Sequence, residues 1–279
     1  MIRFYYVLVT LIIGVAGVAL STGCTSPAPP TPAAPVSLGP PTRLPLTLSS
    51  TPLREKLSFV VSIGFVRLAM ASLWWHRTSA GVGILSSRAW TSGAGRFFRD
   101  TRLRATTVVS LEHGDVRTSR RETDDQGQLR VVSTYFAAEH VSIRFERGQG
   151  SGMVRRDSIA ELAPMDPESF LWEIRQWRPS RGQQLLAVVV SGRTLWLVKL
   201  TAETPRMLNS RLGSLRAQEL AGRARRLDAD GVLLLGAKPR HLRFFLSDDE
   251  QRLPLRIEAD GGIGSVTIEL LNHFRLRVP

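Results

Sequence analysis

An alternation of apolar and polar side chains between residues 242 and 270 constrains the fold more than any other feature of the sequence. Before a polar turn, one face of the chain carries Leu242, Phe244 and Leu246. After the turn, one face carries Leu253, Leu255, Ile257 and Ala259. A period of two is typical of antiparallel strands that bury one face. This stretch predicts a hairpin, followed by a third strand from Val266 to Leu270.

The same pattern recurs in the rest of the chain. We predict further strands over residues 57–65, 68–75, 103–111, 116–122, 129–136, 141–146, 185–191 and 194–200, and another that opens at residue 212. A turn or bulge is expected between Gly64 and Arg67, and residues 221–226 fit a strand or a short helix. The runs 185–191 and 194–200 are apolar at nearly every position, which predicts central strands covered on both faces. The fold class is therefore mainly β, with an antiparallel curved sheet, open half-barrel or sandwich.

One helix is predicted, at about residues 166–177. Asp166 can accept hydrogen bonds from the free N–H groups of the first turn, and Pro167 suits the first helical position. Phe170, Leu171, Ile174 and Trp177 follow at helical spacing, and they make one apolar face.

The first 50 residues have the composition of a targeting segment and a tether. Arg3 precedes an uncharged apolar run, and small residues then lead to Cys24, the only cysteine. This order predicts a lipoprotein-type signal peptide at 1–23, a lipidated Cys24 and a Pro-rich linker at 24–50. The alternative is an uncleaved anchor with an unmodified Cys24. A single β-domain is expected at 51–279, facing the periplasm from the bacterial outer membrane.

The net charge of +13 favours anionic surfaces as partners. Because the arginines are spread along the chain without a basic helix or tail, we expect no nucleic-acid binding. One cysteine leaves no intramolecular disulfide, so the fold must depend on its core.

The turn after residue 246 is predicted to be structural. Ser247, Asp248 and Asp249 have short oxygen side chains that bond nearby backbone N–H groups. One aspartate is expected to cap the turn and pair with Arg252. Pro254 is placed on the polar face of the next strand. The alternative is a site for a hard cation on the three consecutive carboxylates at 248–250.

No pattern for catalysis is found in the sequence. The Gly-rich stretch 148–152 fits no phosphate-binding motif and is predicted to be a flexible turn. The five histidines lack metal-site spacing, and His113 with Asp115 has no accompanying nucleophile motif. We therefore expect neither an enzyme nor a cofactor or metal site.

Four tryptophans could line an apolar ligand site: Trp74, Trp75, Trp177 and Trp196. Large apolar side chains of this kind line most small-molecule pockets. The alternative for all four is packing in the core.

Two stretches carry a resemblance to a known family. They are Leu246 to Pro254, continued by Gly264-Ser265-Val266, and Asp166 to Ser169 with Leu171. Together they resemble the bacterial envelope family catalogued as domain of unknown function three-one-zero-eight. The resemblance implies a mostly antiparallel β-domain in an exported protein, with no established reaction.

Two functions are consistent with these features. The first is a lipid-anchored, non-catalytic binding module that holds an apolar or lipid-like ligand inside the sheet. The second is a structural or assembly protein that joins an envelope complex through its surface. The first predicts a partly open apolar interior with the 166–177 helix lying across it.

Overall fold

The structure is a computed structural model that describes residues 53–78, 81–111, 115–137, 140–147, 150–157, 162–228, 230–234, 236–261 and 264–277. Cys24, with the expected signal peptide and linker, lies outside these residues, as does His113. In the first half of the chain the elements are β1 (Leu53–Ile63), β2 (Val66–Arg77), β3 (Val82–Thr91), α2 (Gly95–Phe98), β4 (Thr101–Ser110), β5 (Val116–Asp125), β6 (Gln128–Phe136), β7 (His140–Arg147) and β8 (Gly150–Asp157). In the second half they are β9 (Pro164–Met165), α3 (Pro167–Gln176), β10 (Gln184–Ser191), β11 (Thr194–Ala202), β12 (Arg206–Ser210), β13 (Gly213–Leu227), β14 (Arg240–Ser247), β15 (Pro254–Gly261) and β16 (Gly264–Arg277).

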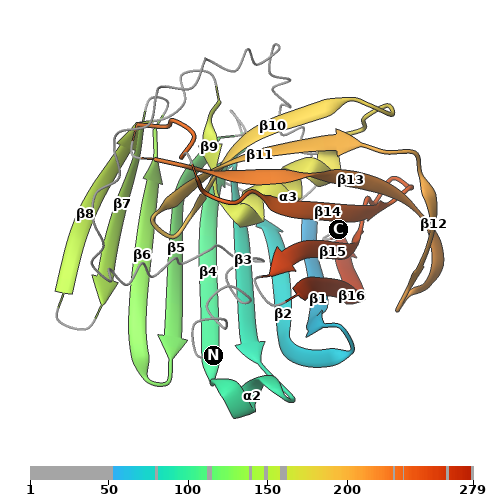
Figure 1. Ribbon diagram of the computed structural model, residues 1–279, viewed down its shortest axis with the longest axis horizontal. Coiled ribbons are helices and arrows are strands. Elements are labelled where there is room, and N and C mark those ends of the chain that lie inside the picture. Colours follow the sequence, from blue (N-terminus) through green and yellow to red (C-terminus); the bar gives the residue numbers. More distant parts are fainter. Residues whose placement is uncertain are drawn as a thin grey trace.

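All sixteen strands belong to one sheet, which curves but does not close (Figure 1). The order runs from β8 back to β1, continues through β16, β15, β14, β13, β11 and β10, and ends at β9, with β12 paired to β13. Neighbouring strands are antiparallel except β9 and β10. The predicted class, mainly β with an antiparallel curved sheet, is confirmed.

The main core lies between the two halves of the sheet, on either side of α3. On one side of the helix, Trp172 stacks on Trp75 of β2, with ring centroids 4.5 Å apart. On the other side, Phe170 meets Phe244 of β14 edge to face at 5.9 Å. The helix therefore joins the β1–β3 wall to the β13–β16 wall inside the curved sheet.

A second, smaller core holds the ends of the sheet together. Val141 and Ile143 of β7 pack there with Val188 and Val190 of β10 and Leu195 of β11. This explains why β10 is apolar on both faces: one face meets the β7 wall, and the other faces the main core.

Several sequence predictions are corrected by the structure. Strand β10 is covered on both faces as expected, but it lies next to the end of the sheet rather than at its centre. Residues 221–226 are strand, within β13. A second short helix, α2, was not predicted, and Gly150–Gly152 belong to β8 rather than to a flexible turn. Pro254 is buried instead of lying on an exposed polar face.

Candidate functional site

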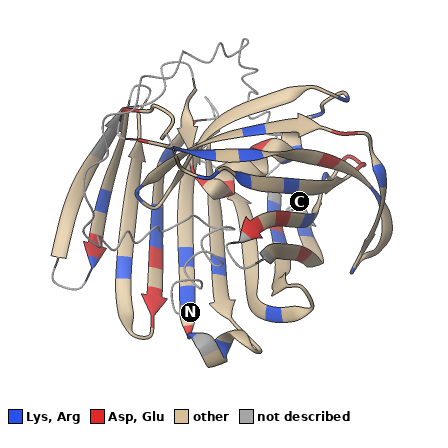
Figure 2. Ribbon diagram, in the orientation of Figure 1, with Lys and Arg blue, Asp and Glu red and all other residues tan. Residues whose placement is uncertain are grey.

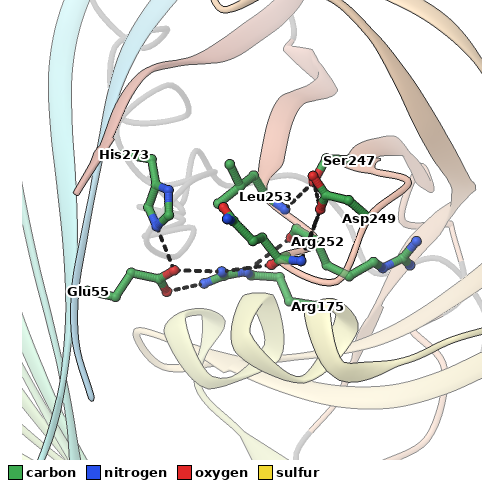
Figure 3. Close-up of polar contacts among 8 residues, drawn as sticks. Glu55, Arg175, Ser247, Asp249, Arg252, Leu253 and His273 are labelled. Atoms are coloured by element: carbon green, nitrogen blue, oxygen red, sulfur yellow. Dashed lines mark hydrogen bonds and ion pairs between the residues drawn. The ribbon is translucent and has the colours of Figure 1, made fainter. Parts of the chain in front are cut away.

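The turn between β14 and β15 is organised by one carboxylate (Figure 3). Asp249 Oδ1 accepts hydrogen bonds from the Ser247 hydroxyl at 2.7 Å and from the N–H groups of Gln251 and Arg252, each at 3.0 Å. The Ser247 hydroxyl in turn accepts one from the Leu253 N–H at 2.7 Å. Arg252 has a φ of 50°, a backbone region that non-glycine residues seldom enter. These hydrogen bonds therefore hold an uncommon backbone conformation.

The side chain of Arg252 forms no ion pair with Asp248 or Asp249, contrary to the sequence prediction. Its guanidinium donates instead to the backbone carbonyl of Trp177, at 3.0 Å. Asp248 pairs with Arg216 of β13 at 2.8 Å, near the surface. Burial, assisted by the positive charge of Arg178, lowers the pKa of Arg252 to about 10. Arg252 thus connects the turn to the end of α3.

A buried ion pair ties the C-terminal end of α3 to the same turn. Arg175 donates two hydrogen bonds to the carboxylate of Glu55 in β1, at 2.6 and 3.0 Å. Its Nε–H donates to the backbone carbonyl of Arg252, and Nη2 also donates to the backbone carbonyl of Gln251, both at 3.1 Å. His273 Nε2 lies 2.9 Å from Glu55 Oε1 (Figure 3). Burial tends to raise the pKa of Glu55, but the hydrogen bonds and charge of Arg175 outweigh it, so the pKa is lowered.

A second buried cluster holds the N-terminal end of α3. Asp166 caps the helix, accepting from the N–H groups of Glu168 and Ser169 at 3.0 and 3.2 Å. The Glu168 carboxyl group accepts hydrogen bonds from the guanidinium of Arg121 in β5 at 3.0 Å and from the hydroxyl of Ser87 in β3 at 2.8 Å. Burial raises the pKa of Glu168 to about 8, against the opposing charge of Arg121. Both ends of α3 are therefore fixed to the sheet by buried hydrogen bonds between an arginine and a carboxyl group.

The four candidate tryptophans do not line a common site. Trp75, Trp177 and Trp196 are buried in the main core, where their role is packing. Trp74 is less buried and, as the neighbour of Trp75 on a strand, faces the outside of the sheet. There Lys56 and Arg88 both lie 5.4 Å from its ring centroid.

Sequence reasoning missed the charged residues that fix α3. Glu55 had a detectable signal, since it shares the phase of Leu57, Phe59 and Val61 on the buried face of β1. A carboxylate in such a phase needs a cationic partner. The partner, Arg175, is 120 residues away, and nothing local identifies it.

Two features are absent from the described part of the chain: a metal-binding cluster and a membrane-spanning helix. No group of three or more His, Cys, Asp or Glu side chains there is arranged to hold a metal ion. Neither described helix has the length and apolarity needed to cross a bilayer. The two described carboxyl groups with raised pKa values, Glu168 and Glu173, both lie on α3. The hydroxyl that contacts Glu168, from Ser87, is buried with it beneath the helix.

Comparison with known proteins supports the fold and nothing finer. No family profile matches the chain, and no curated protein matches its sequence. The chain is similar in structure to the beta-barrel-like protein of domain of unknown function DUF1849 from Brucella abortus. The TM-score is 0.51 at 10% sequence identity, over 80% of this chain and 97% of that chain. DUF1849 is not the family that residues 246–254 resemble, so that family membership stays a prediction.

Proposed function

We propose that the chain is an exported, lipid-anchored envelope protein whose β-domain is a non-catalytic binding module, acting through its outer surface. The observation that carries this proposal is the position of α3. The helix occupies the concave side of the sheet, stacked on Trp75 and fixed at both ends by buried hydrogen bonds between an arginine and a carboxyl group. Binding inside the sheet would require these contacts to break.

The concave wall beyond α3 also favours surface binding over an acyl-chain site. On β4 and β5 its inward residues include Thr107, Ser119, Arg121 and Asp125, which are buried polar or charged groups. Thr107 and Ser119 are hydrogen-bonded to each other at 3.2 Å, and Arg121 is bonded to Glu168, so this part of the wall offers an acyl chain polar groups instead of apolar contacts. The interior is thus only partly apolar.

Titration of the full chain with a fluorescent fatty-acyl probe tests this proposal against a ligand held in the interior. We expect no saturable one-to-one binding, and the same result for Trp172→Ala and for the exposed control Met207→Ala. The contrary result is one-to-one binding of the probe that phospholipid displaces and that Trp172→Ala changes. That result would contradict binding through the outer surface and would support a ligand held inside the sheet.

A further inference from the structure

Three loops lie side by side at one end of the sheet. The β1–β2 turn meets the loop before α2, where the Ser92 N–H donates to the Leu68 carbonyl at 2.9 Å. The chain after α2 meets the β5–β6 turn, where the Gln126 N–H donates to the Asp100 carbonyl at 3.1 Å. We call residues 64–67, 93–97 and 126–129 together the loop rim; it lies at the lower end of the sheet in Figure 1.

Large apolar side chains project from the loop rim into solvent. Phe65 is 101% exposed and Phe97 is 92% exposed, and Val66 and Leu129 are also exposed. Burying such an aromatic side chain would contribute about 1.5–3 kcal/mol of favourable free energy, which is absent while the side chain stays in water. Two such residues on adjacent loops indicate a surface that is covered by something else.

Rigid backbone contacts hold these side chains outward. Gly64 has a φ of +54°, which suits a tight turn and presents Phe65 at its tip. A Cβ atom at Gly95 would lie 2.0 Å from the Leu68 carbonyl oxygen, so only glycine lets α2 sit this close to β2. The position of Phe97, two residues later, depends on this close approach.

Exposed arginines surround the apolar tips. Arg67 and Arg96 are exposed on the loop rim itself, and Arg88, Arg102 and Arg104 are exposed on the adjoining strands β3 and β4. Basic positions along these strands are blue in Figure 2. Arg88 lies directly opposite Arg104 in the strand register. Like charges in that position destabilise a sheet, and Glu122 of β5, which is directly opposite Arg104 on its other side, offsets part of this repulsion.

We propose that the loop rim docks onto the surface of an anionic lipid bilayer, with Phe65 and Phe97 entering the interface and the arginines meeting lipid phosphates. Aromatic tips flanked by cations are what such an interface accepts, because each side chain can insert separately. The proposal rests on the proposed function, since the expected lipid on Cys24 would hold the chain at the membrane surface.

The expected tether permits this orientation. The 28 residues from 25 to 52 would span about 85 Å as an extended polyproline chain. Strand β1 has 11 residues and separates the tether from the loop rim by about 36 Å. The chain can therefore be anchored at Cys24 and still touch the bilayer with the far end of β1.

A site-specific dye tests the docking in the full chain. Lipidation blocks the thiol of Cys24, so Phe97→Cys supplies the only reactive thiol for an environment-sensitive nitrobenzoxadiazole label. Tyr135→Cys is the matched control, because Tyr135 is also exposed but lies near the far end of β6 from the loop rim. The chain is reconstituted in vesicles of phosphatidylcholine, with or without phosphatidylglycerol.

With phosphatidylglycerol, we expect the fluorescence emission of the label at position 97 to shift to shorter wavelength. Its quenching by aqueous iodide should fall by a factor of about three, as for a side chain in the membrane interface. The label at position 135 should not change. Arg67→Gln with Arg96→Gln should remove the protection at position 97, as should high salt.

The outcomes separate the two proposals. Flotation of the vesicles in a density gradient shows whether the chain is bound to them. A chain that floats with the vesicles while iodide still quenches the label at position 97 would overturn the docking but not the proposed lipid-anchored binding module. A chain that floats with neither vesicle would overturn both. Protection of position 97 before vesicles are added would show that the loop rim contacts another protein copy instead of lipid.

Discussion

At the scale of single residues, the two aspartates of the β14–β15 turn have different roles. Asp249 is the acceptor for three hydrogen bonds that shape the turn, one of them to the N–H of Arg252 at its positive φ. Asp248 makes an ion pair with an arginine whose side chain is mostly exposed. The sequence Ser-Asp-Asp predicts a capped turn, but the identical side chains hide which aspartate is the cap.

Asp249→Ala should therefore lower the free energy of unfolding by about 1–3 kcal/mol, because the partly buried Ser247 hydroxyl and Arg252 N–H lose their acceptor. Asp248→Ala should cost less than about 1 kcal/mol, as for other exposed ion pairs. Asp249→Asn keeps an acceptor oxygen at the same position and is the matched control. Urea unfolding of the full-length variants gives the comparison, and equal losses at the two positions would refute the assignment.

Glu173 on α3 gives a prediction for the dependence of stability on pH. Burial raises the pKa of Glu173 to about 7, and no described residue forms an ion pair with its carboxylate. Between its usual pKa and this value, the folded protein keeps a proton that the unfolded chain has released. Stability must then fall as pH rises through this window.

Glu173→Gln removes the titrating group, so the variant should exceed wild type in stability at pH 8 by about 1–3 kcal/mol. The two proteins should match near pH 4, where both states of wild type are protonated. Thermal melts across this range test it, and a constant difference between the two proteins at every pH would contradict the raised pKa.

At the scale of elements, α3 connects the β1–β3 wall of the sheet to the β13–β16 wall. Its N-terminal end is fixed to β3 and β5 by Glu168, and its C-terminal end to β1 by Arg175. The stacking of Trp172 on Trp75 lies between these two points. The fold therefore depends on this ten-residue helix more than its length suggests.

A double-mutant cycle on Glu55 and Arg175 measures this contribution. Each of Glu55→Gln and Arg175→Met should cost about 3–5 kcal/mol, because each leaves an uncompensated buried charge. The double variant should cost much less than the sum. The exposed pair Asp248 and Arg216 is the control, with a coupling energy below about 1 kcal/mol; a comparable coupling in both cycles would argue against burial as the cause.

Most strands were predictable from an apolar period or a continuous apolar run, but β3, whose period is weak, was not. Strand β7 alternates strictly and was found, and α3 was found from its Asp-Pro cap and its apolar face. Strand β3 places Gly83, Ser87 and Thr91 on its inner face, so its alternation is weak and no strand was predicted there. The ion pairs of α3 join residues far apart in sequence, and this information exists only in the folded chain.

At the scale of the whole molecule, a net charge of +13 and the predicted lipid would both favour association with an anionic membrane. These two attractions respond differently to salt. Ionic attraction between exposed charges and lipid is screened above about 0.1 M salt, whereas an acyl anchor is not. Salt therefore separates the contribution of Cys24 from that of the arginines.

We predict that wild-type chain stays with membranes at both low and high salt, and that intact mass shows a diacylglyceryl Cys24 at the N-terminus. Cys24→Ser should stay bound at low salt through its basic surface and be released at high salt once that attraction is screened. The variant Arg67→Gln with Arg96→Gln, made in the Cys24→Ser chain, should be released at lower salt than Cys24→Ser alone, because two of the contacting charges are gone. A Cys24→Ser chain that resists high salt would instead mean that residues 1–23 remain as an uncleaved anchor, since only an inserted apolar segment could then hold the protein.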